Sequence, residues 1–331
     1  HVRSRRQRQM CIRDRSGTHG HRIEPLLKEL REYAWRYCAV ALGREQDKGL
    51  AEAFQDLREI KADVVYPLLL ELYTDYERGV LSRDDLAEIV GMVTSYIFRR
   101  AVCRMPTNSL NRTFSTFTRA IDKSRYLASV KAHLLWLKSY RAFPRDEDFA
   151  RELMYSNMYT FKRRSYLLRK LENAGRKEEV PIEDYTIEHI MPQNENLPRQ
   201  WRDDLGEDWA GVHARYLHTI GNLTLTGYNS EYGDSPFACK RDMEGGFRES
   251  PLRLNRGLGT LDKWDETAIV QRAERLADIA LEVWPRPELP TDLPEMAPHD
   301  TGSQYTIADH PNLLRPVNGA LFEQFRKAVL A

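Results

Sequence analysis

Apolar residues recur at steps of three and four along the first half of the chain, which is the spacing of a helix face. Ser82-Arg83-Asp84-Asp85 predicts the capped start of a helix, whose apolar face carries Leu86, Ile89, Val90, Val93 and Ile97. Two further faces are predicted, one with Leu127, Val130, Leu134 and Leu137 and one with Tyr155, Met158, Phe161, Leu167 and Leu168. Residues 23–172 should therefore be helical.

The pattern changes after Ala174-Gly175. Residues 180–190 and 219–226 predict two short strands, and residues 264–284 predict a closing helix that ends before Pro285. The apolar face of that helix carries Ile269, Ala273, Leu276, Ala280 and Val283. The expected fold class is mainly α, with a helical domain followed by a small α+β unit.

Five segments are expected along the chain. Residues 1–16 resemble a translated sequencing adapter and are interpreted as an assembly artefact. Residues 17–175 form the helical domain and residues 176–285 the α+β unit. Residues 286–303 are a proline-rich linker, and residues 304–331 are the truncated start of a further small domain. On this interpretation the chain is a fragment without its natural N-terminus.

Composition excludes several classes of protein. A chain of 331 residues with 41 % hydrophobic and 30 % charged residues is neither disordered nor a membrane protein, and no apolar run reaches the roughly 20 residues that cross a bilayer. The four cysteines lie far apart, which argues against a zinc or disulfide framework and favours the cytoplasm. No phosphate-binding loop or dinucleotide fingerprint is present.

Positive charge is concentrated in one stretch. Residues 95–170 hold 17 Lys and Arg against 5 Asp and Glu, a difference of 17 − 5 = +12, although the whole chain carries only +1. Such an excess attracts polyanions, and Arg163 and Arg164 are expected to contact DNA. The alternative is that these residues are solvated faces of ordinary helices. RNA is an alternative polymer, since basic helices alone do not read the 2′-hydroxyl.

A possible catalytic group lies at the end of the first predicted strand. Glu188 and His189 are adjacent there, and Asn222 and Asn229 follow in and after the second strand. A neutral imidazole can activate water for phosphodiester hydrolysis. A carboxylate and an amide oxygen, here Glu188 and Asn229, suit Mg²⁺ or Mn²⁺. Neighbours on a strand point to opposite faces, so Glu188 and His189 converge only if the strand ends there, which Pro192 favours.

These motifs resemble a known family. Tyr185–Gln193 together with Gly221–Asn229 is similar to the C-terminal HNH-type (ββα-metal) domain of bacterial DUF262/DUF1524 proteins, which include Gmr-type modification-dependent restriction enzymes and phage-defence nickases. The similarity extends over roughly residues 63–284. It implies a metal-dependent DNA endonuclease or nickase. Its substrate would be double-stranded DNA, possibly modified or from phage, and a nucleotide-hydrolysing N-terminal domain would be missing here.

The resemblance also implies roles for single residues. His189 would be the general base, Glu188 and Asn229 the metal ligands, and Asn222 the residue that holds the loop orienting His189. Lys240 would contact phosphate.

Each motif also has a simpler interpretation. A histidine beside a strand is usually a partly buried polar residue, Asn222 could be a turn residue, and Asn229 could cap a helix. His213 and His218 are rival histidines with structural or supporting roles. The alternative function is therefore a non-catalytic DNA-binding or interaction module with a degenerate site.

Overall fold

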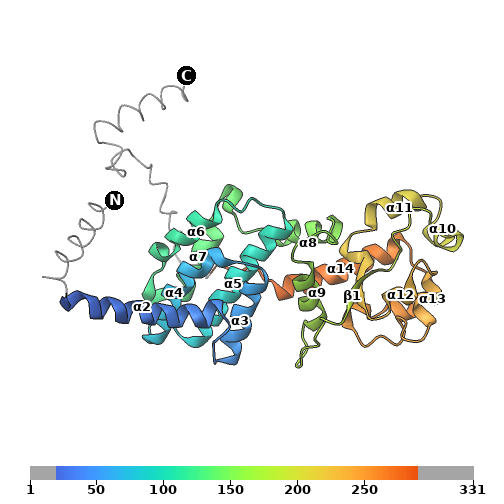
Figure 1. The fold of residues 1–331 in the computed structure, drawn as a ribbon. Coiled ribbons are helices and arrows are strands. Elements are labelled where there is room, and N and C mark those ends of the chain that lie inside the picture. Colours follow the sequence, from blue (N-terminus) through green and yellow to red (C-terminus); the bar gives the residue numbers. More distant parts are fainter. Residues whose placement is uncertain (1–19, 290–331) are drawn as a thin grey trace, which may run out of the picture. The chain divides into compact units, whose positions relative to one another are not determined.

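The computed structural model describes residues 20–289 as a mainly helical chain with one small sheet (Figure 1). The first part contains the helices α2 Gly20–Ala41, α3 Lys48–Glu59, α4 Tyr66–Glu77, α5 Arg83–Val102, α6 Leu110–Phe117, α7 Tyr126–Trp136, α8 Asp146–Tyr155 and α9 Arg164–Asn173. Short 3-10 turns lie between them at Asp63–Val65, Thr118–Ala120, Lys123–Arg125 and Ser139–Arg141. The expected helical first part is thus confirmed.

The second part contains the sheet. Its strands are β1 Thr186–His189 and β2 Leu223–Thr226, which pair antiparallel. The helices around them are α10 Arg199–Leu205, α11 Trp209–Tyr216, α12 Asn229–Tyr232, α13 Phe237–Asp242 and α14 Glu266–Val283, with 3-10 turns at Ile220–Asn222, Arg253–Asn255 and Leu258–Thr260. Both strands are shorter than the apolar runs that predicted them.

Two helices begin with a side-chain cap, of which the cap at Ser82 was predicted from the sequence. The Ser82 side chain accepts a hydrogen bond from the backbone N–H of Asp85 at 3.0 Å, and α5 starts at the next residue. The Asp265 side chain accepts from the N–H of Ala268 at 2.9 Å at the start of α14. In each case the carboxylate or hydroxyl satisfies a backbone donor that the first turn leaves free.

The third predicted helix face is wrong. The chain leaves the helix after Tyr155 and re-enters it at Arg164, so Met158 and Phe161 lie in the turn between α8 and α9. The side chain of Asn157 accepts a hydrogen bond from the N–H of Thr160 at 2.9 Å. Such local hydrogen bonds compete with those of a helix. Residues of this turn contact the sheet, since the Tyr159 ring meets that of His189.

Helix α14 joins the two parts. Its first turns contribute Ile269 to the core beneath α10–α13, and Ala273, Leu276 and Ala280 belong to the core shared with the helical part. Trp284, just after α14, stacks on Phe98 of α5 with ring centroids 4.2 Å apart. The helical residues and the sheet therefore share a continuous core, which fixes the distance between them.

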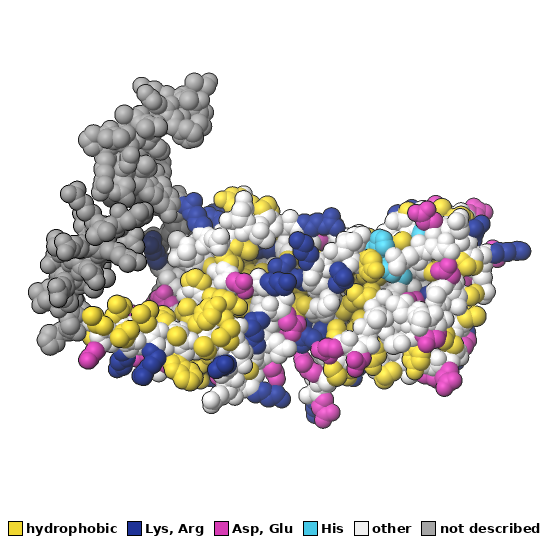
Figure 2. Space-filling view, viewed as in Figure 1, with side chains coloured by type: hydrophobic (Ala, Val, Ile, Leu, Met, Phe, Trp, Pro, Cys, Tyr) yellow, Lys and Arg dark blue, Asp and Glu magenta, His cyan; other side chains and the backbone are white. Residues whose placement is uncertain are grey.

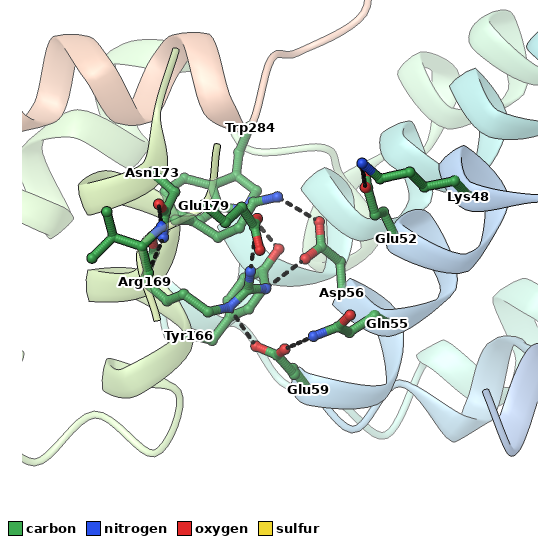
Figure 3. A network of polar contacts seen from close by, with 12 residues as sticks. Lys48, Glu52, Gln55, Asp56, Glu59, Tyr166, Arg169, Asn173, Glu179 and Trp284 are labelled. Atoms are coloured by element: carbon green, nitrogen blue, oxygen red, sulfur yellow. Dashed lines mark hydrogen bonds and ion pairs between the residues drawn. The ribbon is translucent and has the colours of Figure 1, made fainter. Parts of the chain in front are cut away.

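Ion pairs link α9 to α3 (Figure 3). Arg169 Nη2 lies 2.9 Å from Asp56 Oδ1, and its Nε lies 3.1 Å from Glu59 Oε2. Lys170 Nζ lies 2.7 Å from the other oxygen of Asp56. These two cations belong to the basic stretch, but acids from α3 neutralise them. The local charge excess is thus smaller in three dimensions than along the sequence.

Several expectations lie outside the described residues. These are the adapter-like residues 1–16, most of the proline-rich segment 286–303, and the small domain expected at 304–331. Among residues 20–289, no helix is both long and apolar enough to span a membrane.

Candidate functional site

The pairing of β1 with β2 determines where the motif residues point. Glu188 lies opposite Thr224 and His189 opposite Leu223, so the strand continues through both motif residues. Because successive residues of a strand face opposite sides, the Glu188 and His189 side chains diverge. Their contacts agree with this, since Glu188 meets α13 while His189 meets the turn between α8 and α9.

On one face, Glu188 forms a buried ion pair with Lys240 of α13. Lys240 Nζ lies 2.6 Å from Glu188 Oε1 and also donates to the carbonyl oxygens of His189 at 3.2 Å and Ile190 at 3.1 Å. Lys240 has no exposed surface, and Glu188 is 4 % exposed. Burial raises the pKa of Glu188 and lowers that of Lys240, and the attraction between the two charges opposes both shifts. All three donor positions of the ammonium are used.

On the other face, His189 belongs to a cluster of three rings. Its Nε2 lies 3.0 Å from Nδ1 of His218, and the Tyr159 ring meets the His189 ring edge to face at 4.6 Å. Tyr159 also stacks on His218 with ring planes 11° apart. The backbone N–H groups of Met158 and Tyr159 both point at the His218 carbonyl. Tyr159 comes from the turn after α8, so the helical part completes this cluster.

The environment keeps His189 uncharged. Burial lowers its pKa to about 3, and the nearby His218 and Lys240 lower it in the same direction. Burial also lowers the pKa of His218. Both imidazoles are therefore neutral at neutral pH, the form that can accept a proton, although the low pKa of His189 also makes it a weaker base than an ordinary histidine.

Asn222 ties the segment after β1 to its surroundings. Its Oδ1 accepts from the N–H of Met191 at 2.8 Å and from Trp264 Nε1 at 3.1 Å. Its Nδ2 donates to the carbonyls of Met191 and Leu217 at 3.0 and 2.9 Å. The preceding Gly221 lies against α14, where a Cβ atom would be 2.5 Å from the Ile269 carbonyl oxygen. The Gly-Asn pair thus packs the loop that follows His189.

Replacing Asn222 by alanine should destabilise the protein by about 2–3 kcal/mol, because buried partners of its amide would lose their hydrogen bonds. Urea denaturation gives the free energy of unfolding. Asn255→Ala is a matched control, since Asn255 is equally buried and bonds to Thr224 and Leu225. Only Asn222→Ala should also shift the Trp264 indole N–H resonance in NMR. An unchanged resonance would contradict this bonding.

The remaining predicted residues, Asn229, Arg163 and Arg164, make their polar contacts with groups other than the Glu188 and His189 side chains. The Asn229 amide donates to the Ile187 carbonyl at 3.1 Å and to Thr186 Oγ1 at 3.2 Å. Arg163 Nε donates to the Ile60 carbonyl, and the Arg164 guanidinium lies over the Tyr159 ring. On the face in Figure 2, Lys and Arg gather over the helical part, and histidines gather beside α11. Lys240, expected to contact phosphate, is enclosed and could reach one only by leaving Glu188.

The side chains as arranged do not fit the metal site expected from the carboxylate of Glu188 and the amide of Asn229. Within residues 20–289 no group of three or more His, Cys, Asp or Glu side chains that could hold a metal ion is found either. The ammonium of Lys240 lies against Glu188, where a cation would bind. Asn229 donates from its amide nitrogen to Thr186 and Ile187 of β1 rather than offering its amide oxygen beside Glu188.

Two parts of this site were not predicted from the sequence. Tyr159 has no signal of its own, because it lies in a segment whose apolar residues suggested a continuous helix. The contact of Lys240 with Glu188 joins residues 52 positions apart. His218 was named only as a rival histidine, four residues before Asn222.

One comparison with known proteins found a match that covers part of the chain. Residues 143–279 match the family model described as GmrSD restriction endonucleases, C-terminal domain. The match contains α8, the Tyr159 turn, both strands and most of α14. It begins inside the segment expected to form the helical domain. A search of curated proteins found no match.

Proposed function

We propose that the chain is a DNA endonuclease or nickase of a restriction system that acts in phage defence, with His189 as general base. The match of residues 143–279 to a restriction endonuclease domain is the observation that carries the proposal. The antiparallel β1 and β2, followed by the short helix α12, are compatible with the HNH-type (ββα) unit expected from the resemblance to DUF262/DUF1524 proteins.

The ring cluster suggests how His189 would act. Its Nε2 faces His218 Nδ1, and the described residues offer its Nδ1 no hydrogen-bond partner. In the tautomer that donates Nε2–H to His218, the Nδ1 lone pair is available to take a proton from water. His218 would then be the group that orients the base, as catalytic bases generally require. Asn222 would hold the neighbouring loop in place.

One observation favours the alternative of a non-catalytic DNA-binding module. The only carboxylate in the motif is already paired with Lys240, and the metal expected from the resemblance, Mg²⁺ or Mn²⁺, finds no ligand set among the described residues. A protein whose nuclease site binds no metal could still bind DNA through a neighbouring surface. The test must therefore separate binding from cleavage.

Incubation of the full chain with supercoiled plasmid should convert the plasmid to the relaxed form, visible on an agarose gel. Parallel reactions with Mg²⁺, with Mn²⁺ and with EDTA decide whether an added metal is needed. A structured RNA in place of the plasmid tests the other polymer. Plasmid that is bound in a gel-shift assay but never cut under any of these conditions would favour the binding module.

A further inference from the structure

A cavity of about 330 Å³ lies in the helical part, between the end of α3 and the facing ends of α5 and α6. This volume is within the roughly 300–1,000 Å³ of typical small-molecule sites. Three cations line the cavity, Lys61, Arg100 and Arg163, and Asp63 is the one acid among the described residues that line it. Its charge therefore favours an anion.

None of these three cations is paired with a carboxylate in the described part of the chain. Arg163 uses Nε on the Ile60 carbonyl at 2.7 Å, which leaves its two terminal nitrogens available. Arg100 is only 2 % exposed and donates from its terminal nitrogens to the carbonyls of Tyr140 and Pro106, while its buried Nε has no partner. A buried guanidinium without a counter-charge is costly. An anion in the cavity would reduce that cost.

Lys61 is held at the cavity by an unusual backbone conformation. Its φ is 54°, in the left-handed region that non-glycine residues seldom adopt. The turn is closed by hydrogen bonds from the N–H of Lys61 to the Arg58 carbonyl and from the N–H of Ala62 to the Leu57 carbonyl, both 3.0 Å. These two bonds are the Schellman pattern that commonly ends a helix, and they fix the position of Lys61 just after α3, where it lines the cavity.

The cavity is close to the ring cluster along the chain. Arg163 follows Tyr159 by four residues, and the Tyr159 ring touches His189. Four residues span at most roughly 14 Å between Cα atoms. One nucleic acid strand could therefore contact both the ring cluster, through Tyr159, and the cavity, through Arg163.

We propose that this cavity binds a phosphate group of the nucleic acid strand that passes His189. Lys61 and Arg163 would contact the phosphate directly. The buried Arg100 would stabilise it through its positive charge without contacting it. The phosphate site itself follows from the cavity, and only the assignment of that phosphate to a nucleic acid strand rests on the proposed function. A free nucleotide carries the same phosphate chemistry and is distinguished by the test.

The test replaces Lys61 by glycine, which removes the ammonium and is the residue that most often occupies this left-handed position after a helix, so the fold should be kept. Binding of the full chain to a labelled DNA duplex is measured by fluorescence anisotropy at several salt concentrations. The slope of log K against log [salt] should decrease in magnitude by about 0.9, the value of one phosphate contact. Arg104→Gly is the matched control, because Arg104 is exposed with φ 53° and does not line the cavity.

An unchanged slope in Lys61→Gly, an equal change in Arg104→Gly, or no binding of the duplex by the unaltered chain would each overturn the proposal. Calorimetry with inorganic phosphate and with a deoxynucleoside monophosphate provides the second arm. Binding of the monophosphate that Lys61→Gly abolishes, with an unchanged DNA slope, would assign the cavity to a free nucleotide instead. Plasmid nicking is scored separately, so a failed cavity and a failed nuclease give different results.

Discussion

Replacing His189 by alanine should lower the rate of plasmid nicking by about 10²–10⁴, the range typical for loss of a general base. The imidazole is kept neutral by burial and is paired through Nε2 with His218. It is the basic side chain at the end of β1, and alanine can neither take a proton nor orient a water molecule. DNA binding should remain, because His189 is 4 % exposed and contributes little surface.

The measurement compares initial rates of plasmid relaxation, with duplex affinity and melting temperature recorded for the same proteins. His213→Gln is the matched control. His213 is a second buried histidine of the same region, bonded to the Pro192 carbonyl, and glutamine can keep that hydrogen bond. The control should retain most of the nicking activity. Loss of affinity in step with loss of cleavage, or full activity in His189→Ala, would remove His189 from the role of base.

Replacing Lys240 by methionine should destabilise the protein by about 3–5 kcal/mol, the cost of leaving a buried charge without its partner. Methionine has a similar length and no charge. The Glu188 carboxylate would stay enclosed, and the carbonyls of His189 and Ile190 would lose their donor as well. The loss should therefore greatly exceed that of an ordinary surface lysine.

Urea denaturation of the full chain measures this loss, and Lys48→Met is the control because the Lys48 side chain is 93 % exposed. The double variant Lys240→Met/Glu188→Gln should recover part of the stability, since no unpaired charge is then buried. A small effect of Lys240→Met, close to that of Lys48→Met, would mean that the ammonium does not hold Glu188 in solution. Glu188 would then be open to other cations.

Short sequence patterns correctly predicted the helices that are stabilised by residues close together in the chain. Helices α5 and α14 combine a helical repeat of apolar residues with a side-chain cap, and both are found at the expected place. Between residues 155 and 168 an apolar repeat of similar spacing was interrupted by a turn. Met158 is buried there without being helical. The spacing of apolar residues indicates which side chains are buried, but a buried side chain can belong to a turn as well as to a helix.

Charge counted along the chain proved less informative. Lys123, Arg169 and Lys170 all lie in the basic stretch, yet their acidic partners Asp56, Glu59 and Asp75 come from α3 and α4. Ion pairs between helices depend on how the helices pack, and a count of charged residues within one segment leaves out the acids of other helices. The cations that remain without a carboxylate at the cavity became apparent only in the structure.

The sequence by itself determined the helical first part, the two strands, the closing helix and the choice of Glu188, His189, Asn222 and Asn229 as motif residues. These depend on local propensity, capping and the order of residue types. Only the tertiary structure decided that Glu188 and His189 face opposite sides, that Lys240 takes the carboxylate, and that Tyr159 and His218 enclose the imidazole. Those contacts join residues 29 to 52 positions apart, and the shared core around α14 brings them together.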